Sequence, residues 1–98
     1  MGGLKPYSND HMSRILLQKG FIEDRSRDHS FYYLKASEIV YRSVFVKISH
    51  GTHEPGLDIM SKIKRSMKFS NSQDFCRYMD CTMSKEEYIQ MLKSVGII

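Results

Sequence analysis

The sequence contains no long apolar run. A membrane-spanning helix needs about 20 predominantly apolar residues in succession, and no such stretch occurs among the 98 residues. The N-terminus also lacks the pattern of a secretory signal peptide, and the only two cysteines, Cys76 and Cys81, lie close together near the C-terminus. Together these absences predict no membrane-spanning helix, and they favour a reduced protein of the cytoplasm over a disulfide scaffold.

The composition is that of an ordinary globular protein. Hydrophobic residues make up 41% and charged residues 27% of the chain, which excludes an intrinsically disordered protein. The length fits a single domain covering residues 1–98. The net charge of +4 is compatible with a nucleic-acid partner. The excess of basic over acidic residues is greatest in residues 56–70. There Asp58 is the only acidic residue, and the basic residues are Lys62, Lys64, Arg65 and Lys68.

A helix is predicted from Asn9 to Lys19, because Met12, Ile15 and Leu16 fall at helical spacing. Asn9 is the expected N-cap. Gly20 can adopt the left-handed conformation that ends a helix, and Lys19 suits the negative end of the helix dipole.

Three β-favouring runs follow, and they predict an antiparallel meander. The first covers residues 21–25, and Ser26 to Asp28 form a turn. The second covers residues 29–34, so that His29, Phe31 and Tyr33 share one face of the strand while Ser30, Tyr32 and Leu34 take the other. Residues 35–38 interrupt the pattern. In the third strand the two faces carry Val44, Val46 and Ile48 on one side and Phe45, Lys47 and Ser49 on the other, and residues 39–43 either extend this strand or form a hairpin arm.

Three helical patterns complete the chain after a loop at residues 49–56. The first runs from Leu57 to Lys68, with one apolar side (Ile59, Met60, Ile63, Met67) and one basic side. The second begins at residues 70–73, and Ser84 with Glu87 forms a capping box that opens the third, which ends at Gly96. The predicted fold class is α+β.

Several segments resemble the HicA toxin family. They are LLQKGF (Leu16 to Phe21), RDHSFYYL (Arg27 to Leu34), VKISHG (Val46 to Gly51) and EPGLDIMSKIKRSM, and the resemblance covers residues 9–68. It implies an α-β-β-β-α core like a double-stranded-RNA-binding domain, with residues 70–98 as a C-terminal helical extension. HicA proteins are ribonuclease toxins (mRNA interferases) neutralised by a HicB antitoxin, and in the family the histidine that opens the second strand is essential for cleavage. His29 occupies that place.

The resemblance therefore makes His29 the candidate catalytic residue for metal-free RNA cleavage. Imidazole suits this chemistry because its unperturbed pKa of about 6.5 allows it to accept or donate a proton near neutrality. Arg25 and Arg27 can steady the phosphate charge. The side chains expected on the RNA backbone along the later helix are Lys62, Lys64, Arg65 and Lys68.

Other interpretations of the same residues remain open. The basic side of the later helix can be an ordinary solvated surface, and Phe31, Tyr32 and Tyr33 are more often core residues than base-stacking ones. A non-catalytic RNA-binding module is the first alternative. A protein-interaction domain is the second, since five of the seven methionines lie from Met60 onward and suit adaptable surfaces. His50, His53, Cys76 and Cys81 are potential zinc ligands whose order and spacing match no zinc motif, so neither a metal nor another cofactor is expected.

Overall fold

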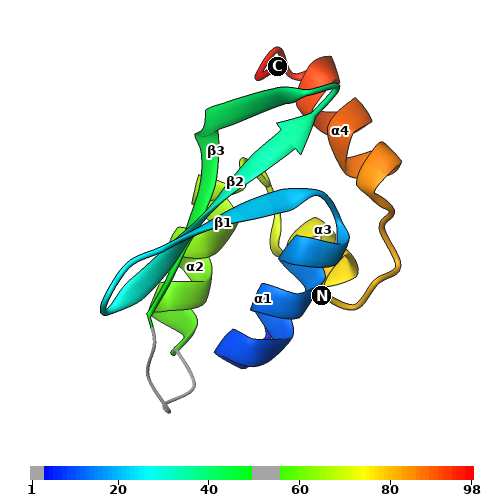
Figure 1. Ribbon diagram of the computed structural model, residues 1–98. Helices are drawn as coiled ribbons and strands as arrows, with labels where there is room; N and C mark the ends of the chain where they lie inside the picture. The colour runs from blue at the N-terminus through cyan, green and yellow to red at the C-terminus, as the bar shows by residue number, and fades with distance from the viewer. Residues whose placement is uncertain (1–3, 50–55) are drawn as a thin grey trace.

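The computed structural model describes residues 4–49 and 56–98. A helix is followed by three strands and three further helices (Figure 1). The elements are α1 (Asn9–Gln18), β1 (Phe21–Arg25), β2 (His29–Ala36), β3 (Ile39–Ser49), α2 (Leu57–Ser66), α3 (Ser72–Met79) and α4 (Lys85–Ser94). The three strands form one antiparallel sheet in the order β1-β2-β3, which confirms the predicted α+β class. None of the helices in the described part is long and apolar enough to cross a membrane.

The hairpin between β2 and β3 is tighter than the sequence pattern indicates. Lys35 and Ala36 continue β2, where they pair with Val40 and Ile39, so the predicted interruption at Lys35 is wrong. Only Ser37 and Glu38 form the turn, and both have positive φ angles, 52° and 66°. Such two-residue turns match the natural twist of the paired strands, and residues 39–43 therefore extend β3.

The ends of α1 show which side chains fix its length. The N-cap is Ser8 rather than Asn9: the Ser8 hydroxyl accepts a hydrogen bond from the His11 backbone N–H at 3.1 Å. The Asn9 side chain instead donates to the Ser49 carbonyl oxygen at 3.0 Å. Gly20 has a φ of +95°, as predicted, and a Cβ there would lie 2.6 Å from Cε of Lys85. The backbone conformation therefore favours glycine, whereas the contact is with the flexible end of the Lys85 side chain, which can move aside.

Helix α2 is shorter than predicted and its apolar side is narrower. It ends at Ser66, and Lys68 lies beyond it with a φ of +70°. The Lys68 N–H donates to the Arg65 carbonyl and the Phe69 N–H to the Lys64 carbonyl, the hydrogen-bond pattern of a Schellman helix end. Ile59, expected on the packed side, is 37% exposed, whereas Met60 and Ile63 are buried.

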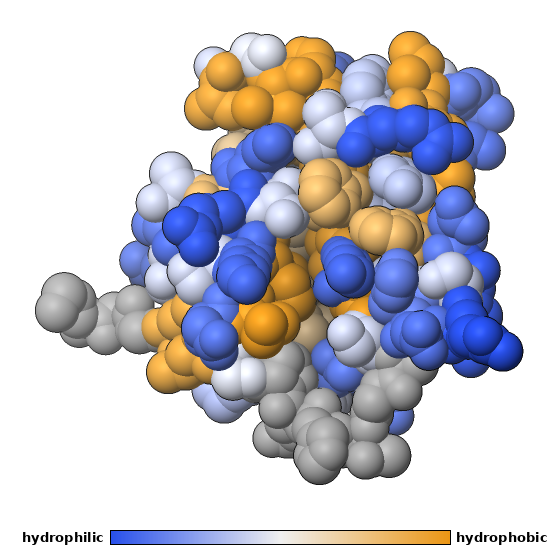
Figure 2. Space-filling model, turned by 90° about the vertical axis from the view of Figure 1, so that its left-hand side faces the viewer, coloured by the Kyte–Doolittle hydropathy of each residue, from blue (hydrophilic) through white to orange (hydrophobic). Residues whose placement is uncertain are grey.

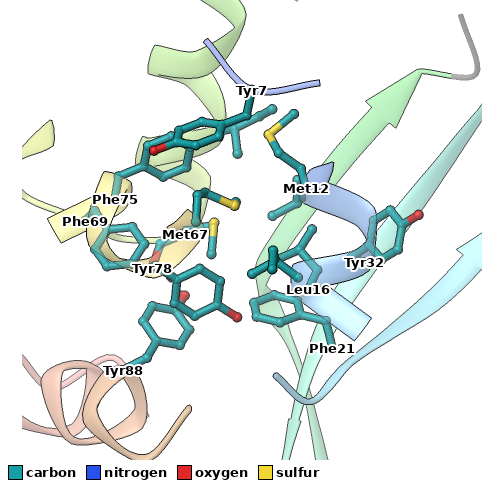
Figure 3. Close-up of a cluster of buried hydrophobic side chains, with 14 of the residues drawn as sticks. Tyr7, Met12, Leu16, Phe21, Tyr32, Met67, Phe69, Phe75, Tyr78 and Tyr88 are labelled. Carbon is teal, nitrogen blue, oxygen red and sulfur yellow. Dashed lines mark hydrogen bonds between the residues drawn. The ribbon is translucent and has the colours of Figure 1, made fainter. Parts of the chain in front are cut away.

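One hydrophobic core lies between the sheet and the helices, and the C-terminal helices are part of it. Phe69 and the rings of α3 and α4 lie opposite residues of α1 and the sheet (Figure 3). The methionines are packed in this core rather than displayed on a surface, which removes their support for a protein-interaction domain. Those buried from α2 onward are Met60, Met67, Met79 and Met83.

The sheet has one face against this core and one face that no described residue of the helices covers. Along β2 burial alternates strictly, with Ser30, Tyr32, Leu34 and Ala36 buried and the residues between them partly exposed. The helices α1, α3 and α4 lie on one side of the sheet in Figure 1, and α2 contributes Met60 and Ile63 to the same core. The uncovered side, here called the open face, carries His29, Phe31, Tyr33 and Lys35 of β2, Arg42, Phe45, Lys47 and Ser49 of β3, and Asp24 of β1.

Candidate nucleic-acid interface

His29 is the first residue of β2 and lies at one end of the open face. Its cross-strand partner is Ser49, the last residue of β3. The imidazole is partly exposed and meets the ring of Phe31 edge-on, with 4.9 Å between ring centroids and 86° between the ring planes. The Ser26 backbone N–H and hydroxyl both donate to the His29 carbonyl oxygen at 2.9 Å. The turn therefore holds the backbone of His29 while its ring faces solvent.

A row of aromatic rings continues from His29 along the open face. Phe31 lies nearly parallel to Tyr33, with centroids 6.2 Å apart and 17° between planes. Phe45, the cross-strand partner of Tyr33, lies 6.4 Å from Phe31. All of these rings are partly exposed and none belongs to the core cluster. The predicted sharing of one face by His29, Phe31 and Tyr33 is confirmed, whereas Tyr32 is a core residue.

Positive side chains border this aromatic row. Lys47 is the cross-strand partner of Phe31, and the guanidinium carbon of Arg42 lies 4.9 Å from the centroid of the Tyr33 ring. Lys35 lies on the same face and forms a loose ion pair with Glu38 of the turn, 3.8 Å between Nζ and Oε2. The acidic residue on this face is Asp24, opposite Phe31 on β1. The open face thus combines flat apolar rings with net positive charge.

The two arginines expected near His29 do not share its surroundings. Arg25 pairs with Ser30, a buried residue, and so belongs to the helix-covered side of the sheet, opposite to His29. Arg27 lies in the exposed turn directly before His29. Of the pair, Arg27 is therefore the one placed to approach a phosphate near the imidazole.

The basic residues of α2 form a separate surface. Lys62 and Arg65 are exposed and Lys64 is partly exposed on the helix, with Lys68 just past its end. Because α2 packs on the helix-covered side of the sheet, these four side chains and His29 lie on opposite sides of it. A short backbone segment cannot contact both surfaces at once.

A polar cavity of about 210 Å³ opens on the helix-covered side, and Arg25 lines it. The Glu23 carboxylate accepts hydrogen bonds from the Ser30 hydroxyl at 2.7 Å and the Tyr32 hydroxyl at 3.2 Å. Tyr32 also hydrogen-bonds Ser13 of α1, and its burial raises the pKa of the phenol. These bonds join α1 to the sheet, so the polar groups of the cavity serve structure.

Only two of the four potential zinc ligands lie within the described residues. His50 and His53 lie outside the described residues, while Cys76 is buried and Cys81 exposed. Within residues 4–49 and 56–98, no three histidine, cysteine or acidic side chains are grouped to hold a metal ion.

Phe45, Lys47 and Arg42 join the candidate site although the sequence did not single them out as functional. The alternation along β3 already placed Phe45 and Lys47 on one face, but only the strand pairing shows that this is the face of His29. No protein-family model, curated protein or solved structure matches the chain.

Proposed function

We propose that this chain is an RNA-binding protein of the HicA toxin kind, which cleaves RNA through His29 without a metal ion. The observation that carries the proposal is the placement of the imidazole: it is partly exposed, it lies on the open face, and it is held against Phe31, whose cross-strand partner is Lys47. The order of the elements from α1 to α2 and their packing also support a core like a double-stranded-RNA-binding domain, since α1 and α2 both contact the sheet from one side. A HicB-like antitoxin and a cytoplasmic location belong to the same proposal.

In the proposed reaction His29 accepts the proton of a ribose 2′-hydroxyl. The oxygen attacks the adjacent phosphorus, a 2′,3′-cyclic phosphate forms, and the bond to the 5′-oxygen of the next nucleotide breaks. Water protonates the departing oxygen, and the proton held by the imidazole returns to solvent. Lys47 and Arg27 are the cations that can balance the growing negative charge on the phosphate oxygens.

The experiment is RNA cleavage by the purified protein and by His29→Gln, both in the presence of a chelator. The variant should lose at least about 100-fold in rate, the usual contribution of a general base. Its melting temperature should match the parent because the ring is partly exposed and outside the core. Lys93→Gln, an exposed change on α4, is the matched control and should cleave normally. Equal cleavage by parent and His29→Gln would exclude the proposed role.

A non-catalytic RNA-binding module is the second candidate, favoured by the exposed basic residues of α2. It is the better description if neither protein cleaves but both bind RNA with a strong salt dependence. In that case, neutralising Lys62, Lys64 and Arg65 together should lower the slope of log affinity against log salt by about three.

A further inference from the structure

We propose that the open face is a base-stacking platform, and that its ligand is an unpaired RNA strand rather than a duplex. This inference rests on the proposed function for the identity of the ligand as RNA. It concerns different residues, however: Phe31 and Phe45 would stack the bases, Tyr33 would hold Arg42 over its ring, and Lys47 and Arg42 would contact the phosphates.

The first support is the position of the rings. Aromatic side chains in a chain of this size are normally used to fill the core, and here Phe21, Phe69, Phe75, Tyr78 and Tyr88 do so. Phe31, Tyr33 and Phe45 instead lie together on the one surface of the sheet that no described helix covers. On the side of the molecule that Figure 2 shows, hydrophobic and hydrophilic residues are interspersed at the surface. Each of these three rings is partly buried against its neighbours and keeps part of its surface open to a ligand.

The second support is the charge around the rings. A protein partner that covers an apolar surface does not require cations, whereas a nucleic-acid strand does. Lys47 lies directly across from Phe31, and Arg42 lies over Tyr33. Flat rings that alternate with cations are the combination that single-stranded nucleic acids require, because each nucleotide offers one base to stack and one phosphate to neutralise.

The third support is geometric and separates a single strand from a duplex. In a duplex the faces of the bases are stacked on one another and cannot lie on protein rings, and recognition then proceeds through backbone and grooves. The rings of the open face are available only to bases that have left such a stack. An unpaired strand on this platform would pass His29 at its end, since His29 contacts Phe31.

A tryptophan reporter tests the platform directly, because the sequence contains no tryptophan. Phe45→Trp places the single indole on the platform, and Leu57→Trp places it at the start of α2, at a side chain that is 53% exposed. The ligand is an oligouridine with 2′-O-methyl groups, which cannot be cleaved. The oligouridine should quench the tryptophan emission of Phe45→Trp and leave that of Leu57→Trp unchanged. A fully paired duplex of the same length should quench the emission of neither variant.

Affinity measurements complete the test. The double variant Phe31→Leu with Phe45→Leu keeps apolar bulk but removes the rings, and it should bind the single strand at least about tenfold more weakly. Val95→Ala, a change at an apolar side chain just after α4 that is 60% exposed, is the matched control and should bind like the parent. Unchanged affinity of the leucine variant, preference for the duplex, absence of RNA binding, or self-association through this face in sedimentation would each overturn the platform.

These outcomes are independent of those for cleavage. A protein that binds the oligouridine through its rings but cleaves no RNA would retain the platform and lose the ribonuclease proposal. If the double variant Phe31→Leu with Phe45→Leu cleaves RNA with an unchanged KM, the ribonuclease proposal is retained and the platform is lost.

Discussion

The ammonium group of Lys19 is held by Tyr78 in the interior of the protein. Nζ of Lys19 donates to the Tyr78 carbonyl oxygen at 2.7 Å and lies 4.4 Å from the centroid of the same residue's ring. A second hydrogen bond, also 2.7 Å, goes to the carbonyl oxygen of Met83. Lys19 therefore connects the end of α1 to α3 and to the segment that leads into α4.

Replacing Lys19 by methionine should destabilise the protein by about 2–3 kcal/mol. The apolar stem is retained, but two buried carbonyl oxygens lose their charged donor. Lys93→Met, at an exposed position of α4, should change stability by less than about 0.5 kcal/mol. Urea unfolding of both variants measures the difference, and equal midpoints would mean that the carbonyl groups find other donors.

Two neighbouring buried tyrosines should respond oppositely to loss of the hydroxyl group. Tyr88 donates a hydrogen bond to the Met67 carbonyl at 2.7 Å, so Tyr88→Phe should cost about 1 kcal/mol. The Tyr78 hydroxyl has no hydrogen-bond partner among the described residues, so Tyr78→Phe should be neutral or stabilising by about 1 kcal/mol. Thermal melting of the pair checks the sign, and destabilisation by both changes would indicate an unrecognised partner for Tyr78.

The protein should unfold in alkaline solution above about pH 10, the usual pKa of tyrosine. Burial raises the pKa values of Tyr7, Tyr78 and Tyr88. The folded state then binds more protons than the unfolded state, so stability is full below pH 10 and falls as the pH rises further. Burial also lowers the pKa of Lys19, which favours the folded state with rising pH below about 10.5. This one lysine opposes four tyrosines, because burial raises the pKa of Tyr32 as well. Circular dichroism and tyrosinate absorbance should change together, and complete tyrosinate formation with the fold retained would contradict this linkage.

Lys68→Gly should stabilise the protein by about 1 kcal/mol, because Lys68 holds a left-handed conformation that glycine adopts without strain. Lys64→Gly, inside α2, should cost about 1 kcal/mol. Each variant also removes one positive charge from the same surface. If α2 contacts RNA phosphates, both should lower the salt slope of binding by about one, although their stabilities change in opposite directions.

The sequence predicts helix ends well where glycine provides the left-handed residue and poorly elsewhere. Gly20 and Gly96 have positive φ angles and were expected to end helices. Lys68 and Cys81 have the same conformation, with φ of 70° and 64°, yet nothing in their chemistry signals it. Tertiary packing of Phe69 and Met83, which are buried just after them, outweighs the local preference.

The sequence predicts which residues of one strand share a face, but it does not predict which residues of neighbouring strands lie beside them. Period-two alternation was sufficient to place His29 with Phe31 and Tyr33. The pairing of Arg25 with Ser30 and of Lys47 with Phe31 depends on register, which the turns set. For this reason the sequence placed Arg25 with His29, whereas the structure puts Arg25 on the other side of the sheet.

Because burial alternates strictly along β2, four of its eight residues pack in the core and the other four do not. Ser30, Tyr32, Leu34 and Ala36 face the core, and His29, Phe31, Tyr33 and Lys35 face outward. Substitutions at the outward positions leave the core contacts intact, so these side chains can change while the fold is kept. If the open face binds RNA as proposed, a lineage descended from this protein can change what it binds through four codons of this strand.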